Sequence, residues 1–228
     1  MIPIIKWTLW QRKTSIIWWS IGVASLIFIT LIFYPSFKDE AAQLQRRFEN
    51  LPDAAVQLFG GSTDFFSPIG FLNSQLYFIV LPLVLAILAI GLGSSLVAQE
   101  EQSLNIELLL GRPISRSKLL LAKSLAGGLI LTFVTLVGLV ATVVTAKLVD
   151  LDVATSLIAL VTLDCLLLTL CFGAIALVIT MFGKARSASL GIATFIALGG
   201  YIISSLAGTV DWLETPSKIF PFHYYQSE

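Results

Sequence analysis

The chain has 228 residues, of which 57% are hydrophobic and only 12% are charged, and its mean hydropathy is +0.90. Soluble domains carry about a quarter charged residues, so this composition excludes a soluble globular fold and indicates an integral membrane protein. The formal net charge is zero and there is no basic tail or stripe, which argues against a nucleic-acid partner.

Residues 1–14 mix apolar and basic side chains, with two tryptophans among them. The tryptophans and cations are Trp7, Trp10, Lys6, Arg12 and Lys13. This mixture predicts a short amphipathic helix lying in the headgroup plane, although an ordinary aromatic flank of a membrane span fits the same residues equally well. The apolar run at 16–34 is too long for the core of a cleaved signal peptide, so we expect a retained first span.

Residues 35–74 form an outer segment that carries a periodic apolar stripe. The stripe consists of Phe37, Ala41, Leu44, Phe48, Leu51, Ala55 and Leu58. Steps of three and four residues predict an amphipathic helix, which Pro52 is expected to bend. Its simplest role is to rest on the membrane surface or on the helix bundle; the alternatives are a gate at the outer mouth and a substrate-binding surface.

Five segments are long and apolar enough to cross a bilayer, which takes about 20 residues of helix. They are residues 16–34, 75–97, 124–146, 153–182 and 187–209. Backbone groups find no water inside lipid, so each segment is predicted to be helical. The fourth is long enough to be tilted or broken, and the fifth carries small residues every fourth position, which favours close helix packing.

The distribution of Lys and Arg predicts an N-terminus inside the cell. Nine of these cations fall in inner segments (Lys6, Arg12, Lys13, Arg112, Arg116, Lys118, Lys123, Lys184 and Arg186) and five in outer ones (Lys38, Arg46, Arg47, Lys147 and Lys218). Five spans then leave the C-terminus outside. Its last residues look like the lead-in to another helix, so we expect a chain truncated before a sixth span.

The loop between the second and third predicted spans, residues 98–123, has an acidic limb, a leucine-rich turn, a helix stop and a basic limb. These parts are Glu100, Glu101 and Glu107; residues 108–110; Gly111 and Pro113; and Arg116 and Lys118. Glycine and proline end helices, so a helix–break–helix element is expected. A solvated loop does not need a leucine cluster, which favours docking of a partner protein; a self-packed elbow is the alternative.

The stretch 100–116 resembles the E-E-x-G-T-L-E-L-L-L-x-x-P-V-S-R segment of permeases in the type-2 ABC membrane family, and residues 66–72 resemble the segment before their second span. The resemblance covers essentially the whole chain. Leu104 and Asn105 replace the family's Gly-Thr pair, a change that would alter how the loop helix bends. The implied fold is an all-α integral membrane bundle of about five transmembrane helices, a sixth being expected but absent, with an N-terminal interfacial helix and a cytoplasmic coupling loop.

The resemblance implies a permease subunit of an ABC exporter in the plasma (inner) membrane, working with a cytoplasmic ABC ATPase and a second permease copy or paralogue. It assigns the coupling role to Glu100, Glu101, Glu107, Leu108, Arg112, Pro113 and Arg116. The chain has no G-x-x-x-x-G-K-[ST] phosphate loop, so ATP and Mg²⁺ are expected on the partner, with no cofactor or metal bound here. Besides these proteins, membrane lipid is the expected partner.

Asp164 is the acidic residue inside the fourth predicted span. A carboxylate at the bilayer centre costs roughly 2.5–3.5 kcal/mol on insertion scales, so it should face protein or water. It lies on a substrate or ion path in one interpretation. In the other, it is a structural residue satisfied by hydroxyl groups of a neighbouring helix. The sequence does not identify the substrate.

Three other classes of protein fit less well. An intramembrane enzyme needs paired catalytic groups, and the single histidine, His223, stands in the terminal segment; Cys165 and Cys171 form no metal pattern. An ion channel needs filter loops or charge rings, which are not apparent. A non-transporting scaffold or sensor of the same topology is the main alternative, and a copurifying ATPase separates it from a permease.

Overall fold

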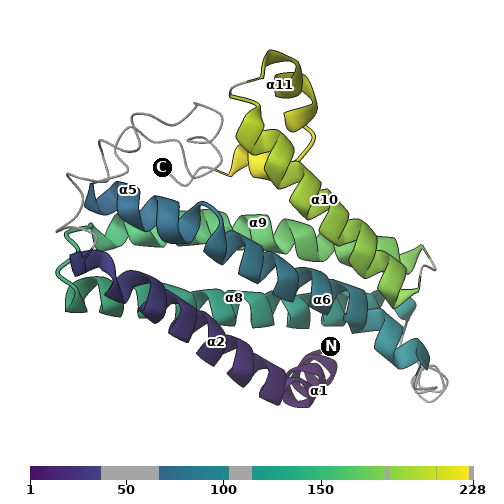
Figure 1. Ribbon diagram of the computed structural model, residues 1–228. Coiled ribbons are helices and arrows are strands. Elements are labelled where there is room, and N and C mark those ends of the chain that lie inside the picture. Colours follow the sequence, from purple (N-terminus) through teal and green to yellow (C-terminus); the bar gives the residue numbers. More distant parts are fainter. Residues whose placement is uncertain (37–66, 103–114, 183–184, 209, 226–228) are drawn as a thin grey trace.

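The computed structural model describes residues 1–36, 67–102, 115–182, 185–208 and 210–225 (Figure 1). Within these ranges every regular element is helical. Five stretches are long and apolar enough to cross a membrane: Lys13–Ser36, Pro68–Leu96, Ser117–Leu148, Thr155–Met181 and Arg186–Leu206. The predicted all-helical, polytopic membrane fold is therefore confirmed.

The five spans run in alternating directions, each antiparallel to the one before it (Figure 1). In chain order they are α1 (Ile2–Gln11), α2 (Lys13–Ile32), α5 (Pro68–Leu72), the π-helix η1 (Asn73–Tyr77), α6 (Val80–Gln102), α8 (Arg116–Leu148), α9 (Thr155–Met181), α10 (Arg186–Leu206), α11 (Asp211–Ser217) and the 3₁₀-helix η2 (Pro221–Tyr224). We call the end of the bundle that holds the start of α2 and the end of α6 the proximal end, and the opposite end the distal end.

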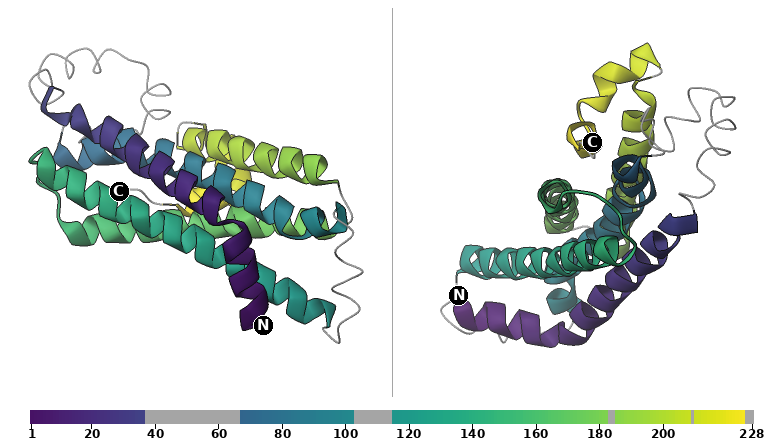
Figure 2. Two further views of the ribbon diagram at one scale, coloured as in Figure 1. Left: turned by 90° about the horizontal axis from the view of Figure 1, so that it is seen from below. Right: turned by 90° about the vertical axis from the view of Figure 1, so that its left-hand side faces the viewer.

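The pair α6 and α9 forms the centre of the bundle, and α8 packs beside it with α2 on its other side (Figures 1 and 2). α1 bends away from the axis of α2 and lies against α8 at the proximal end. Leucines of α6 and apolar side chains of α9 are fully buried between the helices, among them Leu81, Leu85, Ile158 and Phe172. On the outside, large apolar side chains are exposed along every span, which is the surface that lipid covers.

Of the two possibilities for the fourth span, a tilt or a break, the break is excluded: α9 is one continuous helix of 27 residues, and the second span is the broken one. There the backbone changes from α-helix to π-helix at Asn73, and the amide of Phe78 donates to the carbonyl of Asn73 over 2.8 Å. Pro82 lacks an N–H group, so the Phe78 carbonyl loses its usual helical donor. The break is therefore encoded locally.

Close approaches occur at one glycine outside the fifth span and at one of the small residues within it. α6 crosses α9 at Gly93, where an added Cβ would collide with the carbonyl oxygen of Gly173. On α10, Gly191 has open space around it, whereas a Cβ on Gly200 would lie 2.7 Å from the ring of Phe220. Glycine at 93 and at 200 thus permits two intramolecular contacts.

Candidate functional site

The loop predicted at 98–123 proves to have helical residues at both ends. α6 continues to Gln102, so Glu100 and Glu101 belong to its last turn, and α8 begins at Arg116. The remaining predicted docking residues, Glu107, Leu108, Arg112 and Pro113, lie outside the residues that the structure describes. The described part of this candidate site is therefore the base on which the loop stands, made by the proximal ends of two spans.

Two cations from different helices converge on neighbouring residues of α6 at this base. The guanidinium of Arg12, at the junction of α1 and α2, donates to the hydroxyl of Ser95 over 2.8 Å. The ammonium of Lys123, on α8, donates to the carbonyl of Leu96 over 3.0 Å. The C-terminal part of a helix carries partial negative charge, so cations are favoured there. We call Arg12, Lys123, Ser95 and Leu96 the proximal clamp.

The proximal clamp is shielded from solvent and lipid by the helices around it. Lys123 is only 5% exposed and Ser95 only 2%. A buried ammonium group is costly unless acceptors satisfy it, so Lys123 is held firmly in place. One turn further along α8, a Cβ on Gly127 would lie 2.8 Å from Leu96, which shows how closely α8 approaches α6 here. The two limbs of the loop thus rise from a single packed unit.

A second polar cluster surrounds the break in the second span. The Thr162 hydroxyl donates to the Ile158 carbonyl over 2.6 Å, so its oxygen accepts the proton of Tyr77, whose hydroxyl is 2.7 Å away. Both side chains are buried. From the end of the described chain, the Tyr225 hydroxyl donates to the Tyr77 carbonyl over 2.7 Å. We call Tyr77, Thr162 and Tyr225 the polar seam.

Tyr225 belongs to the segment that follows the last span. Burial raises the pKa of its phenol above the usual range, with the nearby Cys165 thiol as the next cause. The group therefore stays protonated and remains a hydrogen-bond donor to the broken span.

Asp164 lies on α9 close to the polar seam. Its side chain is partly buried, whereas that of the adjacent Cys165 is fully buried in the core. Asp164 is near enough to Tyr225 to interact with it electrostatically. The position thus faces protein at least in part, as the cost of a lipid-facing carboxylate requires.

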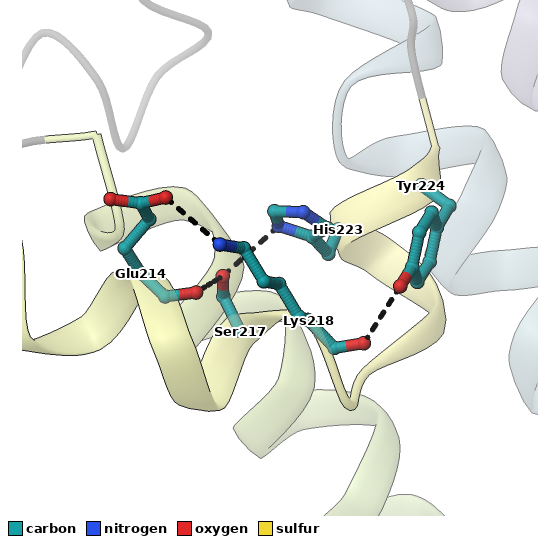
Figure 3. A network of polar contacts seen from close by, with 5 residues as sticks. All are labelled: Glu214, Ser217, Lys218, His223 and Tyr224. Carbon is teal, nitrogen blue, oxygen red and sulfur yellow. Dashed lines mark hydrogen bonds and ion pairs between the residues drawn. The ribbon is translucent and has the colours of Figure 1, made fainter.

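α11 and η2 follow α10 and pack against it, and their polar contacts are drawn in Figure 3. The buried Ser217 hydroxyl donates to the Glu214 carbonyl over 2.7 Å, and its oxygen lies 3.0 Å from Nδ1 of His223. Lys218 pairs with Glu214 over 3.0 Å on the surface. The contact between Ser217 and His223 thus joins α11 to η2.

After α11 the chain turns back between α10 and the centre of the bundle. The ring of Phe222 stands 5.4 Å from that of Phe172 on α9 and 5.6 Å from that of Tyr201 on α10, measured between centroids. At the other end of α10, the Ser189 hydroxyl donates to the Ala176 carbonyl of α9 over 2.8 Å. α10 is therefore fastened to α9 proximally and separated from it distally by an aromatic wedge, which fits its tilt in Figure 1.

These features define a class of protein: a polytopic helical membrane protein whose second and third spans are joined by a polar contact at the base of the loop between them. A family model described as "ABC-2 family transporter protein" matches residues 12–219, which is most of the chain. The chain therefore belongs to the ABC-2 transporter family and is a transport permease subunit, as the resemblance of residues 100–116 predicted. No curated protein and no solved structure matches it.

Sequence reasoning missed the proximal clamp and the polar seam. From the sequence, Arg12 was a cation of the interfacial segment and of the charge count, Lys123 only a charge that orients the spans, and Tyr77 only part of an apolar run. A usable signal existed for Lys123 and for Tyr77. Lys123 stands two turns inside a helix that continues as a span, where an unpaired ammonium would be costly, and Asn73, Gln75 and Pro82 interrupt the second apolar run.

Proposed function

We propose that this chain is the permease subunit of an ATP-driven exporter and that the loop between α6 and α8 docks a separate cytoplasmic ABC ATPase. The substrate path runs through the bundle, with Asp164 as a candidate polar contact on it. A second permease copy or a paralogue completes the transporter, in a plasma (inner) membrane with the N-terminus on the cytoplasmic side.

The observation that carries this proposal is the construction of the loop's base. A docking loop transmits force only if both of its limbs resist bending, and here α6 and α8 reach the loop as continuous helices joined by Lys123 and Leu96. A push on such a base tilts spans as rigid bodies, the mode of movement expected for transporters. The proximal position of Glu100, Glu101 and Arg116 agrees with docking from the side on which the N-terminus lies.

The test is a pulldown of the full-length gene product in mild detergent, with copurifying proteins identified and ATPase activity assayed. Glu100→Lys combined with Glu101→Lys, and separately truncation of leucines 108–110 to alanine, should reduce the bound ATPase about tenfold without changing membrane insertion, because docking loses its charged and apolar contacts. Glu214→Lys, at the exposed ion pair of the distal end, is the matched charge-reversal control and should bind the ATPase normally.

Survival of ATPase binding in both loop variants would show that the docking assignment is wrong. A wild-type chain that purifies without any ATPase from its own cell would favour the alternative, a membrane scaffold or sensor of the same topology.

A further inference from the structure

Arg12 lies where α1, α2 and α6 meet at the proximal end of the bundle. It is the single residue between α1, which lies across the proximal end, and α2, the first span. Its backbone departs from the helical path there, with φ −102° and ψ 7°, so the two helices join at an angle. Any change in this angle requires the Arg12 side chain to move with it or to lose its partner.

That partner belongs to the limb of the docking loop. The Ser95 hydroxyl donates to the Leu92 carbonyl over 3.1 Å, so its oxygen is oriented to accept from Arg12. The two residues are 83 positions apart in the chain, and Ser95 is followed directly by Leu96, which receives Lys123. A charge-assisted hydrogen bond is short and directional, so a displacement of Ser95 is passed to the side chain of Arg12.

α1 is also held from its other side. Its buried residue is Thr8, and the helix packs along the proximal part of α8, the second limb of the loop. Arg12 therefore links α1 and α2 to α6, while packing links α1 to α8.

We propose that Arg12, through Ser95, is a positioning residue that carries displacement of the docking loop's base into α1 and the first span. This inference rests on the proposed function, because it gives the loop's movement a route to a helix that the loop does not adjoin in sequence. Lys123 holds the two limbs together, and Arg12 connects that unit to the rest of the bundle. Without Arg12 the ATPase still binds, and the base still moves, but the first span no longer follows.

The experiment uses the full chain with its copurified ATPase in lipid nanodiscs and measures hydrogen–deuterium exchange with no nucleotide and with ATP plus vanadate. In the wild type, the exchange of residues 98–120 and of residues 4–20 should both change when nucleotide is trapped. In Arg12→Gln and in Ser95→Ala the first change should persist, and the second should fall about tenfold, the factor that corresponds to one charged hydrogen bond.

Two further variants separate this role from a merely structural one. Lys13→Gln removes the adjacent cation, whose ammonium lies 4.8 Å from the centre of the Trp10 ring, and should respond like the wild type. Arg12→Lys keeps a cationic donor and should restore much of the response. The double variant Arg12→Gln/Ser95→Ala should lose no more than Arg12→Gln alone, since the bond that Ser95→Ala removes is already lost in it. Every variant is first checked for monodispersity and for unchanged ATPase binding.

A wild-type response of residues 4–20 in Arg12→Gln overturns the inference and leaves the proposed function intact. Additive losses in the double variant overturn it as well, because the two side chains would then act separately. A wild-type chain that binds no ATPase overturns the proposed function, and this inference with it.

Discussion

At the scale of single residues, hydroxyl groups of the polar seam hold two spans together. Each of these hydroxyls donates to one acceptor and so fixes the direction of the next hydrogen bond. Tyr77 donates to Thr162, and Thr162 donates to the backbone of its own helix. Inside a membrane an unpaired hydroxyl cannot turn to water, so this order specifies the register of α9 against the broken second span.

We expect Tyr77→Phe and Thr162→Val each to lower the free energy of unfolding by about 0.5–1.5 kcal/mol, the usual net value of one hydrogen bond. Because both remove the same bond, the double variant should lose clearly less than the sum. Thr169→Val is the control on the same helix: Thr169 donates only locally, to the Cys165 carbonyl over 2.6 Å, and its effect should add to that of Tyr77→Phe. Unfolding in mixed micelles, followed by circular dichroism, measures the free energy of unfolding of the three single variants and of the two double variants.

Single residues were also where the sequence was least informative about the site. The roles of Arg12, Lys123 and Tyr225 depend on partners 83, 27 and 148 positions away, and no local pattern marks those partners. The docking residues could be predicted, because they stand together in one segment of 17 residues, and a short segment carries its signal without knowledge of the fold.

At the scale of helices, composition and length predicted the five spans to within a few residues, except that the second span begins seven residues, and α8 eight residues, before the predicted starts. The extension of α8 follows from chemistry that hydropathy does not register: residues 116–123 include three cations, and their helix is stabilised by packing against α6 and α1. Helix crossings were predicted less well, because a glycine permits a close approach without specifying which partner makes it.

The crossing of α6 and α9 allows a test of which glycine of α6 makes the close contact with α9. Gly93→Ala should destabilise the protein by about 1–3 kcal/mol, because its Cβ meets the backbone of α9, which cannot move aside. Gly91→Ala, two residues earlier on the same helix, has nothing within 4 Å and should be neutral or stabilising by up to about 1 kcal/mol. Equal thermal unfolding midpoints for the two variants would mean that α6 and α9 do not pack as described.

On α10, beside the aromatic wedge, Gly199 and Gly200 form a second matched pair of glycines. A methyl group on Gly200 would lie 2.7 Å from Phe220 Cδ1 and 3.1 Å from its Cβ, so the ring cannot simply rotate away. Gly200→Ala should therefore loosen residues 218–225, seen as a severalfold rise in their hydrogen exchange. Gly199→Ala, with open space around it, should leave that exchange unchanged. Protection that persists in Gly200→Ala would place Phe220 elsewhere.

At the scale of the whole molecule, the asymmetry of Lys and Arg predicts how the bundle is oriented. Single cysteines at the exposed positions Lys118 (proximal) and Asp152 (distal) test it in a background of Cys165→Ala and Cys171→Ser. In intact cells a membrane-impermeant maleimide should label Asp152→Cys, and should label Lys118→Cys only after permeabilisation. The reverse pattern would put the docking loop on the outer face and contradict an ATPase partner in the cytoplasm.

The bond from Tyr225 to Tyr77 has a consequence for how the protein is made. The two residues are 148 positions apart, so a ribosome finishes all five spans before the donor emerges. Spans one to four can assemble as they leave the insertion machinery. At that stage the Tyr77 carbonyl, at the break in the second span, does not yet have its Tyr225 donor. The contacts of that early helix are therefore completed only after the five described spans have been made. A chain whose synthesis stopped after α10 would hold these five spans and yet lack the Tyr225 donor for the carbonyl of Tyr77.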